Sequence, residues 1–364
     1  MGVLRQWERG ADAFCVLAAN TLTERLCMDL AGFDAGLRPE GVVWSPDSRR
    51  IAFDEDIART MRDGDLWVLD VATGEATHLT DDGYRGALPT AETNSGTDVY
   101  LDTNPAWSPD GTALVFARTV WQRDAAPTPI VRVGIADGRE TTLLSLGDRD
   151  GAMFVKPLWS SDGRRIVYSE VLPDEGDRRN GVWEFGVDGQ GWRQITGADP
   201  ASGPPVLAEL SAGGDLALVH YPQPLDRWDG SPWAILDLAT GAVTPLGTLA
   251  GGEATAAASD VTATVGASFS PDGRSILIVS WVGDVGALLV EAVGGEVTPL
   301  LGGIPAAEPV RPAGGNTWAT NGTIFVPTGD GDGLLVELAG VAPATPVARR
   351  AAEDGSFALV AIRV

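Results

Sequence analysis

The segment from Asn104 to Ala117, NPAWSPDGTALVFA, constrains the fold of this 364-residue chain more than any other feature. One apolar stretch enters the turn formed by residues 108–111, and a second apolar stretch leaves it, a pattern that predicts a β-hairpin. Pro fixes φ at the second turn position, Asp bonds nearby backbone groups, and Gly accepts a positive φ. Each turn residue therefore has a mechanical reason to be there.

The same hairpin recurs along the chain. In each copy an apolar anchor residue precedes the turn, and an apolar strand follows it. The anchors are Trp44, Trp107, Trp159, Leu210, Phe269 and Trp318. Successive anchors lie 63, 52, 51, 59 and 49 residues apart, a period that is typical of propellers and solenoids.

A second hairpin completes each full copy of the repeat. It occupies residues 65–80, 182–196, 232–246 and 289–301, and a tight turn that contains Gly joins its two strands. One period therefore holds four antiparallel strands with two tight turns. Four strands per period is the content of a propeller blade.

The W-S-P-D-G start of the repeat, together with its T-G turn and L-T finish, resembles the TolB-like, PD40-type (WD40-like) β-propeller repeat over about residues 40–340. The resemblance implies an all-β fold, a β-propeller of four-stranded antiparallel blades. Such propellers serve as binding platforms, as accessory domains of peptidases, and as lyases or hydrolases, so the resemblance implies no single function.

We expect a single domain, residues 1–364, because a propeller stays one closed unit at this length. Blades are predicted to start near residues 41, 104, 156, 206, 266 and 315. Residues 1–40 read as a partial blade, and the apolar strand within residues 349–364 has no later partner. We therefore predict seven blades, closed by pairing of the N- and C-terminal strands. Six blades is the alternative, if the N-terminal hairpin is peripheral.

The chain is strongly acidic, with a net charge of -24. This charge argues against nucleic acid or an anionic membrane surface as a partner, because phosphate binding needs clustered Lys and Arg. Acidic residues keep an all-β protein soluble, and a cationic partner is the alternative explanation. No apolar run approaches the length of a membrane helix, so we expect no membrane insertion and a monomer.

The N-terminal residues lack an apolar segment long enough for a secretory signal, so a full-length chain is expected to be cytoplasmic. If a signal has been removed, the alternative is an exported protein, periplasmic or extracellular. Cys15 and Cys27 lie in a predicted hairpin over residues 13–30, where they could face each other. They form either a disulfide, which implies an oxidising compartment, or two buried small residues.

The connections between strands are of two kinds. First-to-second and third-to-fourth turns are short and uniform, whereas second-to-third loops and blade connections, such as 54–64 and 170–181, are long and varied. In a propeller the two kinds lie on opposite faces. We name the second the loop-rich face, and we predict that it binds a ligand, since variation on a rigid scaffold collects where binding happens.

Arg and aromatic side chains in these loops can stack on, and pair with, a planar or anionic ligand or a peptide. The alternative is that they pack the loops against one another. Together with Asn104, which lies three residues before an anchor, the predicted ligand-binding residues are Trp121, Arg123, Arg178, Arg179, Tyr221, Arg227, Trp228, Trp281 and Arg311.

Catalytic motifs such as G-x-S-x-G, H-E-x-x-H and C-x-x-C are absent. His78 is predicted on an outer fourth strand and read as structural. His220, at the loop end of a second strand, and Lys156, at the start of an inner strand, are the predicted catalytic residues if the protein is an enzyme. Lyases with this type of propeller hold a metal with several His and Gln ligands, and one well-placed His departs from that pattern.

Acidic residues in two loops could bind Ca²⁺ through oxygen ligands. The candidates are Asp54 and Asp56 in one loop and Asp330 and Asp332 in the other. Asp-Gly turns without a metal are the commoner interpretation. The sequence thus favours a binding platform for a protein, peptide or small anionic ligand on the loop-rich face. The alternative is a lyase or hydrolase with its active site in the central funnel.

Overall fold

The computed structural model describes most of the repeat strands and turns. The described residues are 2–6, 12–17, 24–29, 39–55, 64–84, 87–88, 99–121, 128–145, 154–172, 174, 176–199, 203–221, 233–246, 264–280, 284–291, 297–305, 318–320, 323–327, 333–337, 346–350 and 357–361. The chain divides into two compact units. The internal unit is Leu30–Asp199 with Pro204–Val206, and the terminal unit, which contains both chain ends, is Met1–Asp29, Pro200–Gly203 and Leu207–Val364.

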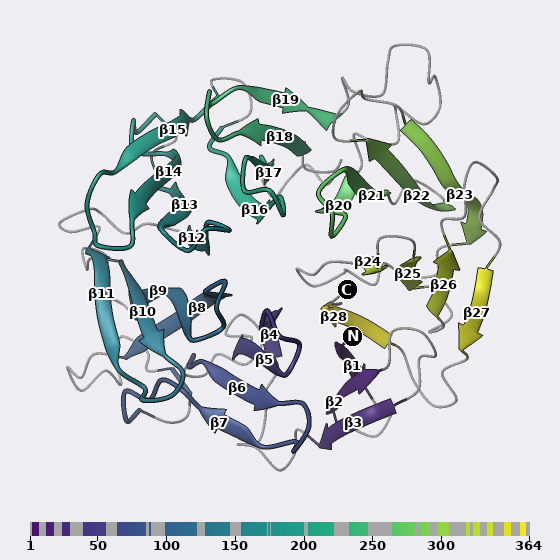
Figure 1. The fold of residues 1–364 in the computed structure, drawn as a ribbon, viewed down its shortest axis with the longest axis horizontal. Coiled ribbons are helices and arrows are strands. Elements are labelled where there is room, and N and C mark those ends of the chain that lie inside the picture. The colour runs from purple at the N-terminus through teal and green to yellow at the C-terminus, as the bar shows by residue number, and fades with distance from the viewer. Residues whose placement is uncertain are drawn as a thin grey trace. The chain divides into compact units, whose positions relative to one another are not determined.

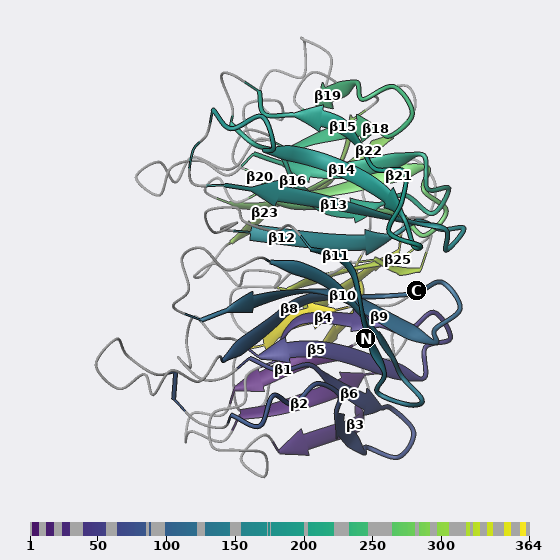
Figure 2. The same cartoon turned by 90° about the vertical axis from the view of Figure 1, so that its left-hand side faces the viewer.

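The internal unit contains three four-stranded antiparallel sheets (Figure 1). The first is β4 (Pro39–Trp44), β5 (Arg50–Glu55), β6 (Trp67–Asp70) and β7 (Ala76–His78). The second is β8 (Tyr100–Trp107), β9 (Ala113–Val120), β10 (Pro129–Gly134) and β11 (Glu140–Ser145). The third is β12 (Phe154–Trp159), β13 (Arg165–Val171), β14 (Gly181–Gly186) and β15 (Arg193–Gly197), whose strands lie side by side in chain order (Figures 1 and 2).

The terminal unit contains sheets of the same kind. Three of them follow chain order, as the internal sheets do. The first is β16 (Val206–Leu210), β17 (Leu216–His220), β18 (Trp233–Asp237) and β19 (Val243–Pro245). The next are β20 (Thr264–Phe269), β21 (Ser275–Ser280), β22 (Asp284–Glu291) and β23 (Val297–Pro305), and β24 (Trp318–Thr320), β25 (Thr323–Pro327), β26 (Gly333–Glu337) and β27 (Pro346–Arg350).

The fourth sheet of the terminal unit joins the two ends of the chain. Its order is β28 (Phe357–Ala361), β1 (Gly2–Gln6), β2 (Asp12–Leu17) and β3 (Glu24–Asp29). Strand β28 pairs antiparallel with β1, with Leu4 opposite Ala358. In the β2–β3 hairpin Cys15 lies opposite Cys27. Cys27 is disulfide-bonded and Cys15 is the only other cysteine, so a disulfide joins these two strands rather than two unpaired cysteines.

The predicted turn is built by a repeated set of hydrogen bonds. Ser108 Oγ donates to Asp110 Oδ1 at 2.6 Å, and the same oxygen of Asp110 accepts the Thr112 N–H at 3.0 Å. Ser108 Oγ also accepts the Ala113 N–H at 3.0 Å, and Gly111 has a φ of 68°. The equivalent Ser–Asp pairs are Ser45–Asp47, Ser160–Asp162 and Ser270–Asp272. The turn therefore satisfies its own polar groups, which makes it a reusable local unit.

The anchor residues join neighbouring sheets within each unit. Trp107 is 8% exposed, and it packs with Ala52 and Leu66 of the preceding sheet. Its Nε1–H donates to the Val43 carbonyl at 3.1 Å. In the terminal unit Trp318 Nε1–H donates in the same way to the Ser268 carbonyl at 3.3 Å. The buried indole N–H of these two anchors thus finds a partner on the neighbouring sheet, whereas the buried indole nitrogens of the anchors Trp44 and Trp159 have no hydrogen-bond partner among the described residues.

Candidate functional site

Asn104, a predicted ligand-binding residue, lies in a bulge of β8 and ties together three strands of the internal unit. The register between β8 and β9 shifts between Thr103 and Ala106, and Asn104 has a φ of 57°. Its backbone N–H donates to Asp54 Oδ2 at 2.8 Å, and its Nδ2 donates to the Val155 carbonyl at 3.1 Å. Bulges re-aim side chains. Here the re-aimed side chain holds β12 beside β8.

Gly41 occupies the equivalent position in β4, three residues before its anchor, and has a φ of 54°. A Cβ there would lie 2.6 Å from Asp54 Oδ1, so the carboxylate of Asp54 takes the space of a side chain. Asp54, a predicted Ca²⁺ ligand, is 5% exposed and supports these bulges. The other predicted Ca²⁺ ligands, Asp56, Asp330 and Asp332, lie outside the described residues.

The two predicted catalytic residues fall in different units. Lys156 is half-buried on β12, opposite Ser169, in a stretch of regular register. His220 ends β17 and lies against Trp233 of β18, with ring centroids 5.2 Å apart at 38°. Tyr221, which follows it, is buried. Within its own unit, His220 is thus part of an aromatic pair at the end of a hairpin.

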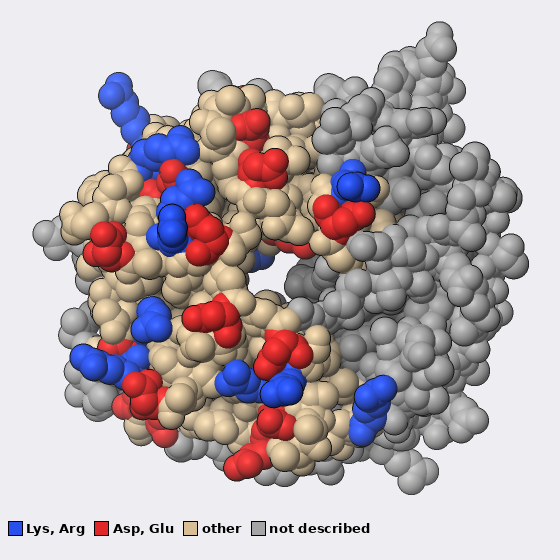
Figure 3. Space-filling model, viewed as in Figure 1, with Lys and Arg blue, Asp and Glu red and all other residues tan. Residues whose placement is uncertain are grey.

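The described arginines of the predicted set lie in the loop between β13 and β14. Arg179 forms an ion pair with Asp177, with Nε donating to Oδ1 at 2.9 Å. The Arg179 carbonyl accepts the Trp183 Nε1–H at 2.8 Å. Arg178 is exposed, and its carbonyl accepts Gln194 Nε2 at 3.0 Å. Arg179 is therefore neutralised by a neighbour, whereas the Arg178 side chain faces solvent. Figure 3 shows basic and acidic side chains interspersed over the face in view.

Trp121 is half-buried against a small apolar cluster of Leu88, Val99 and Leu101. This contact agrees with the alternative in which loop aromatics pack the loops. The remaining predicted ligand-binding residues, Arg123, Arg227, Trp228, Trp281 and Arg311, lie outside the described residues.

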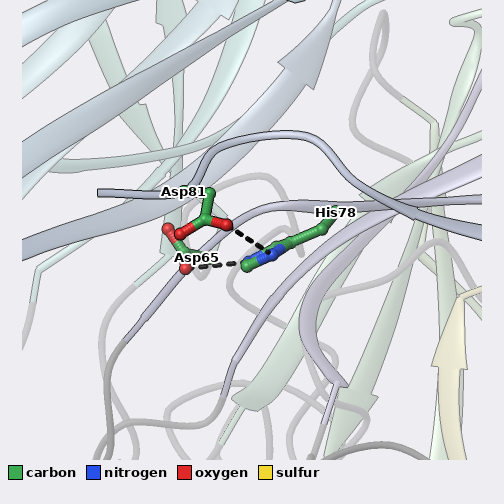
Figure 4. Close-up of side chains that lie close together, drawn as sticks. All are labelled: Asp65, His78 and Asp81. Carbon is green, nitrogen blue, oxygen red and sulfur yellow. Dashed lines mark hydrogen bonds and ion pairs between the residues drawn. The ribbon is translucent and has the colours of Figure 1, made fainter. Parts of the chain in front are cut away.

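A polar cluster that the sequence did not single out lies at the open end of the β6–β7 hairpin, away from the turn that joins the two strands (Figure 4). His78 Nε2 lies 2.8 Å from Asp65 Oδ2, and His78 Nδ1 lies 3.7 Å from Asp81 Oδ2. The imidazole stacks on Trp67, with ring centroids 4.3 Å apart and an interplanar angle of 16°. Thr80 donates its hydroxyl to Asp65 Oδ1 at 3.3 Å. The histidine ring is therefore fixed between two carboxylates.

A second charged network lies on the adjoining strands β8 and β9. Arg118 binds Asp102 through two parallel hydrogen bonds, Nε to Oδ1 at 2.7 Å and Nη2 to Oδ2 at 2.8 Å. It also donates to Glu140 through Nη1 at 2.7 Å. The Asp102 N–H donates to the Gly64 carbonyl at 2.8 Å, which ties this network to the segment that carries Asp65.

Burial sets the electrostatics of both groups. It raises the pKa of Asp65, and the hydrogen bond from His78 opposes that rise. It raises the pKa of Asp102 to about 6, against the bonds from Arg118. For Arg118 burial acts to lower the pKa, but the hydrogen bonds to Asp102 and Glu140 outweigh it and raise the pKa. Buried carboxylates need compensating partners, which are Arg118 for Asp102 and the hydrogen bond with His78 for Asp65.

The Asp65–His78–Asp81 cluster had a signal in the sequence. Asp65 comes two residues before the third strand of its blade, and His78 and Asp81 lie at and just after the end of the fourth strand. The start of one strand and the end of its antiparallel neighbour meet at the same end of a hairpin. The position of His78 on an outer strand, taken alone, does not predict that Asp65 and Asp81 lie beside it.

Comparison with known proteins places the fold. No protein-family model matches the sequence, and no curated protein matches it. Among solved structures, TolB from Acinetobacter baumannii is similar with a TM-score of 0.53 and 15% identity, over 83% of this chain and 64% of that one. This chain therefore spans somewhat less than two thirds of TolB.

Two further structures cover nearly the whole chain. The oligogalacturonate lyase in complex with manganese has a TM-score of 0.53 and 14% identity, over 94% of both chains. The β-propeller domain of the Trilobed protease from Pyrococcus furiosus has a TM-score of 0.51 and 11% identity, over 97% of this chain and 91% of that one. The fold is thus an all-β, TolB-like propeller with four-stranded antiparallel blades.

Proposed function

We propose that the two units together form one seven-bladed propeller, residues 1–364, that binds a protein or peptide through its loop-rich face. The blade number is supported by the seven four-stranded sheets. Closure is supported by the pairing of β28 with β1. The platform role is supported by the contrast between the two ends of the sheets.

The observation that carries the proposal is the uneven placement of buried charge. At the turn end the same Ser–Asp hydrogen bonds recur from sheet to sheet. At the loop end of the internal unit, Asp65 and Asp102 are both under 5% exposed, and they belong to no repeated motif. Buried charge destabilises a fold unless it is compensated. His78 and Arg118 compensate these two charges. This end of the unit therefore holds a charged arrangement that the repeat itself does not supply, which supports a role for it in function.

A small anionic ligand is the weaker candidate, because Arg179 already pairs with Asp177 and Arg118 with Asp102. A lyase or hydrolase would use His220 and Lys156, which belong to different units, and the described ring contact of His220 is with Trp233. The fold likeness to a lyase at 14% identity concerns architecture alone. A protein or peptide partner needs only an exposed, chemically varied surface.

The test compares two exposed arginines of one sheet. Arg178 lies in the β13–β14 loop, and Arg164 lies in the β12–β13 turn, at the other end of β13. Peptides selected from a display library against the full chain should bind Arg178→Ala at least about tenfold more weakly than the parent if they contact this loop. Arg164→Ala should bind them like the parent. If Arg164→Ala loses affinity and Arg178→Ala does not, the loop-rich face is not the binding face.

The disulfide suggests where the protein works. A Cys15–Cys27 bond persists in oxidising compartments and is rare in the cytosol, so we propose an exported protein rather than a cytoplasmic one. Thiol titration of the denatured protein, purified from its own source with free thiols blocked at lysis, should detect no free thiol until a reductant is added. Two titratable thiols before reduction would support the cytoplasmic alternative.

A further inference from the structure

The side chains of Asp65, His78 and Asp81 offer three ligand atoms, one from each residue, that all lie within 4.8 Å of one another. Within the part of the chain that the structure describes, they are the one such group of three metal-binding side chains. We propose that they form a binding site for a divalent transition-metal ion, best matched by Zn²⁺. This inference shares Asp65 with the argument for the proposed function, but it rests on the internal geometry of the cluster and holds or fails whether or not a peptide binds.

The ligand atoms lie within 4.8 Å of one another, and they must draw closer to hold a small ion. Ligand atoms at zinc–ligand distances of 2.0–2.1 Å in a tetrahedron lie about 3.3 Å apart. At present Asp65 Oδ2 lies 2.8 Å from His78 Nε2, and Asp81 Oδ2 lies 3.7 Å from His78 Nδ1. These contacts use the two different ring nitrogens, and one ion binds only one of them, so one carboxylate must turn toward the nitrogen that holds the ion. An ion bound at one ring nitrogen would take the place of the bridging proton. Asp81 is the member that moves to complete the site, since its side chain is 43% exposed.

The surrounding groups hold the ligands as outer partners do in metal sites. Trp67 fixes the plane of the His78 ring by stacking. Thr80 donates to Asp65 Oδ1, and the Thr80 hydroxyl itself accepts the Leu66 N–H at 3.0 Å. The Gly83 N–H donates to Asp81 Oδ1 at 2.9 Å, which leaves Oδ2 turned toward the histidine. One oxygen of each carboxylate is thus anchored while the other faces the cluster.

Charge and access also suit a cation. Two carboxylates and a neutral imidazole balance a divalent ion, and imidazole selects transition metals over Ca²⁺ and Mg²⁺. Asp82 and Asp102 add to the negative field at Asp65. The nearby cation, Arg118, is bound to Asp102 and Glu140. The buried side of the site is Asp65 and the open side is Asp81, so three protein ligands leave a position for water or a ligand from solution.

Zinc binding to the full chain provides the test. The tag-free protein, stripped with a chelator and dialysed, should bind one Zn²⁺ per chain in isothermal titration calorimetry. Zinc should also raise its melting temperature, because ligands that bind the folded state stabilise it. Ca²⁺ and Mg²⁺ at the same concentration should do neither.

Two variants locate the ion. His78→Phe keeps an aromatic ring on Trp67 but removes the nitrogen ligands, and Asp81→Asn removes an exposed carboxylate at little risk to folding. Each should weaken zinc binding at least about tenfold. Asp137→Asn is the matched control, because Asp137 is an exposed turn aspartate that accepts the Arg139 N–H just as Asp81 accepts the Gly83 N–H. It should bind zinc like the parent.

Three results would overturn the proposal. One is a parent chain that binds no Zn²⁺. Another is an Asp81→Asn chain, folded by circular dichroism, that binds it with parental affinity. The third is a preference for Ca²⁺ over Zn²⁺. After either of the first two results the cluster is an Asp–His–Asp ion-pair arrangement that holds no zinc, and after the third it is not a transition-metal site.

Discussion

At the scale of single residues, the turn aspartates have one chemistry in every regular copy of the repeat. The Ser108 hydroxyl and the Thr112 N–H hold the pKa of Asp110 below its ordinary value of 3.8. The same causes, a serine hydroxyl and a backbone N–H, lower the pKa of Asp47, Asp162 and Asp272. The ionised form is therefore the one that the folded turn prefers.

This preference predicts a pH-dependent loss of stability in acid. A carboxyl group with a pKa lowered by folding contributes stability above its unfolded pKa and loses it as pH falls through the folded one. Asp110→Asn keeps an acceptor for both hydrogen bonds but cannot ionise. Urea midpoints of parent and variant should therefore differ at pH 6 and converge as the pH falls below 3.8, the ordinary pKa of Asp110. A difference that stays constant from pH 6 to pH 3 would contradict this account of the turn.

Residues whose role depends on distant partners were harder to predict. The sequence places Asn104 at the start of an inner strand, beside the loops. No local pattern predicts its positive φ or its hydrogen bonds to Asp54 and Val155, each about 50 residues away. His78 was interpreted as structural for the same reason. Its neighbours, Asp65 and Asp81, come from outside the strand that carries it.

At the scale of elements, the sequence pattern carried most of the information. Strand pairs and their turns can be predicted from two signals, the apolar strand segments and the Ser-Pro-Asp-Gly or Thr-Gly turns between them, because both signals are local in the sequence. Even the worn copy at Leu210 keeps its turn, since Ser211 Oγ bonds Asp215 and accepts the Leu216 N–H. The serine keeps its place in this turn, but its aspartate partner comes four residues later instead of two. The turn geometry therefore tolerates a changed motif.

Bulges are the elements that the pattern does not predict. The register of β4 shifts between Glu40 and Val43, and that of β8 shifts between Thr103 and Ala106, in each case just before the anchor. Strand β12 has no such shift. In β4 the shift depends on a glycine whose missing side chain makes room for Asp54. A bulge is therefore decided by packing between sheets, which single-sequence periodicity does not report.

At the scale of the whole molecule, the expectation of a propeller rested on the repeat period and on its resemblance to TolB-like repeats. The four-stranded sheets and the fold likeness bear out the architecture. The joining of the chain into one closed ring is the proposal that depends most on long-range order. No local signal specifies a pair of strands that lie about 350 residues apart.

The described residues contain no helix with the length and hydropathy of a membrane span.

Closure makes β1 depend on β28. In the closed ring β1 lies between β2 and β28, so its amides bond strands on both sides. Removing β28 would leave β1 as an edge strand, and exposed edges exchange hydrogen readily and promote aggregation.

Hydrogen exchange measured by mass spectrometry over residues 2–6 tests this most directly, in the full chain and in a chain that ends at Gly355. The closed ring predicts slow exchange in the full chain, together with lost protection or aggregation in the shortened one. Equal protection of residues 2–6 in a soluble, cooperatively folded shortened chain would show that the ring closes elsewhere, and the six-bladed alternative would then replace this account.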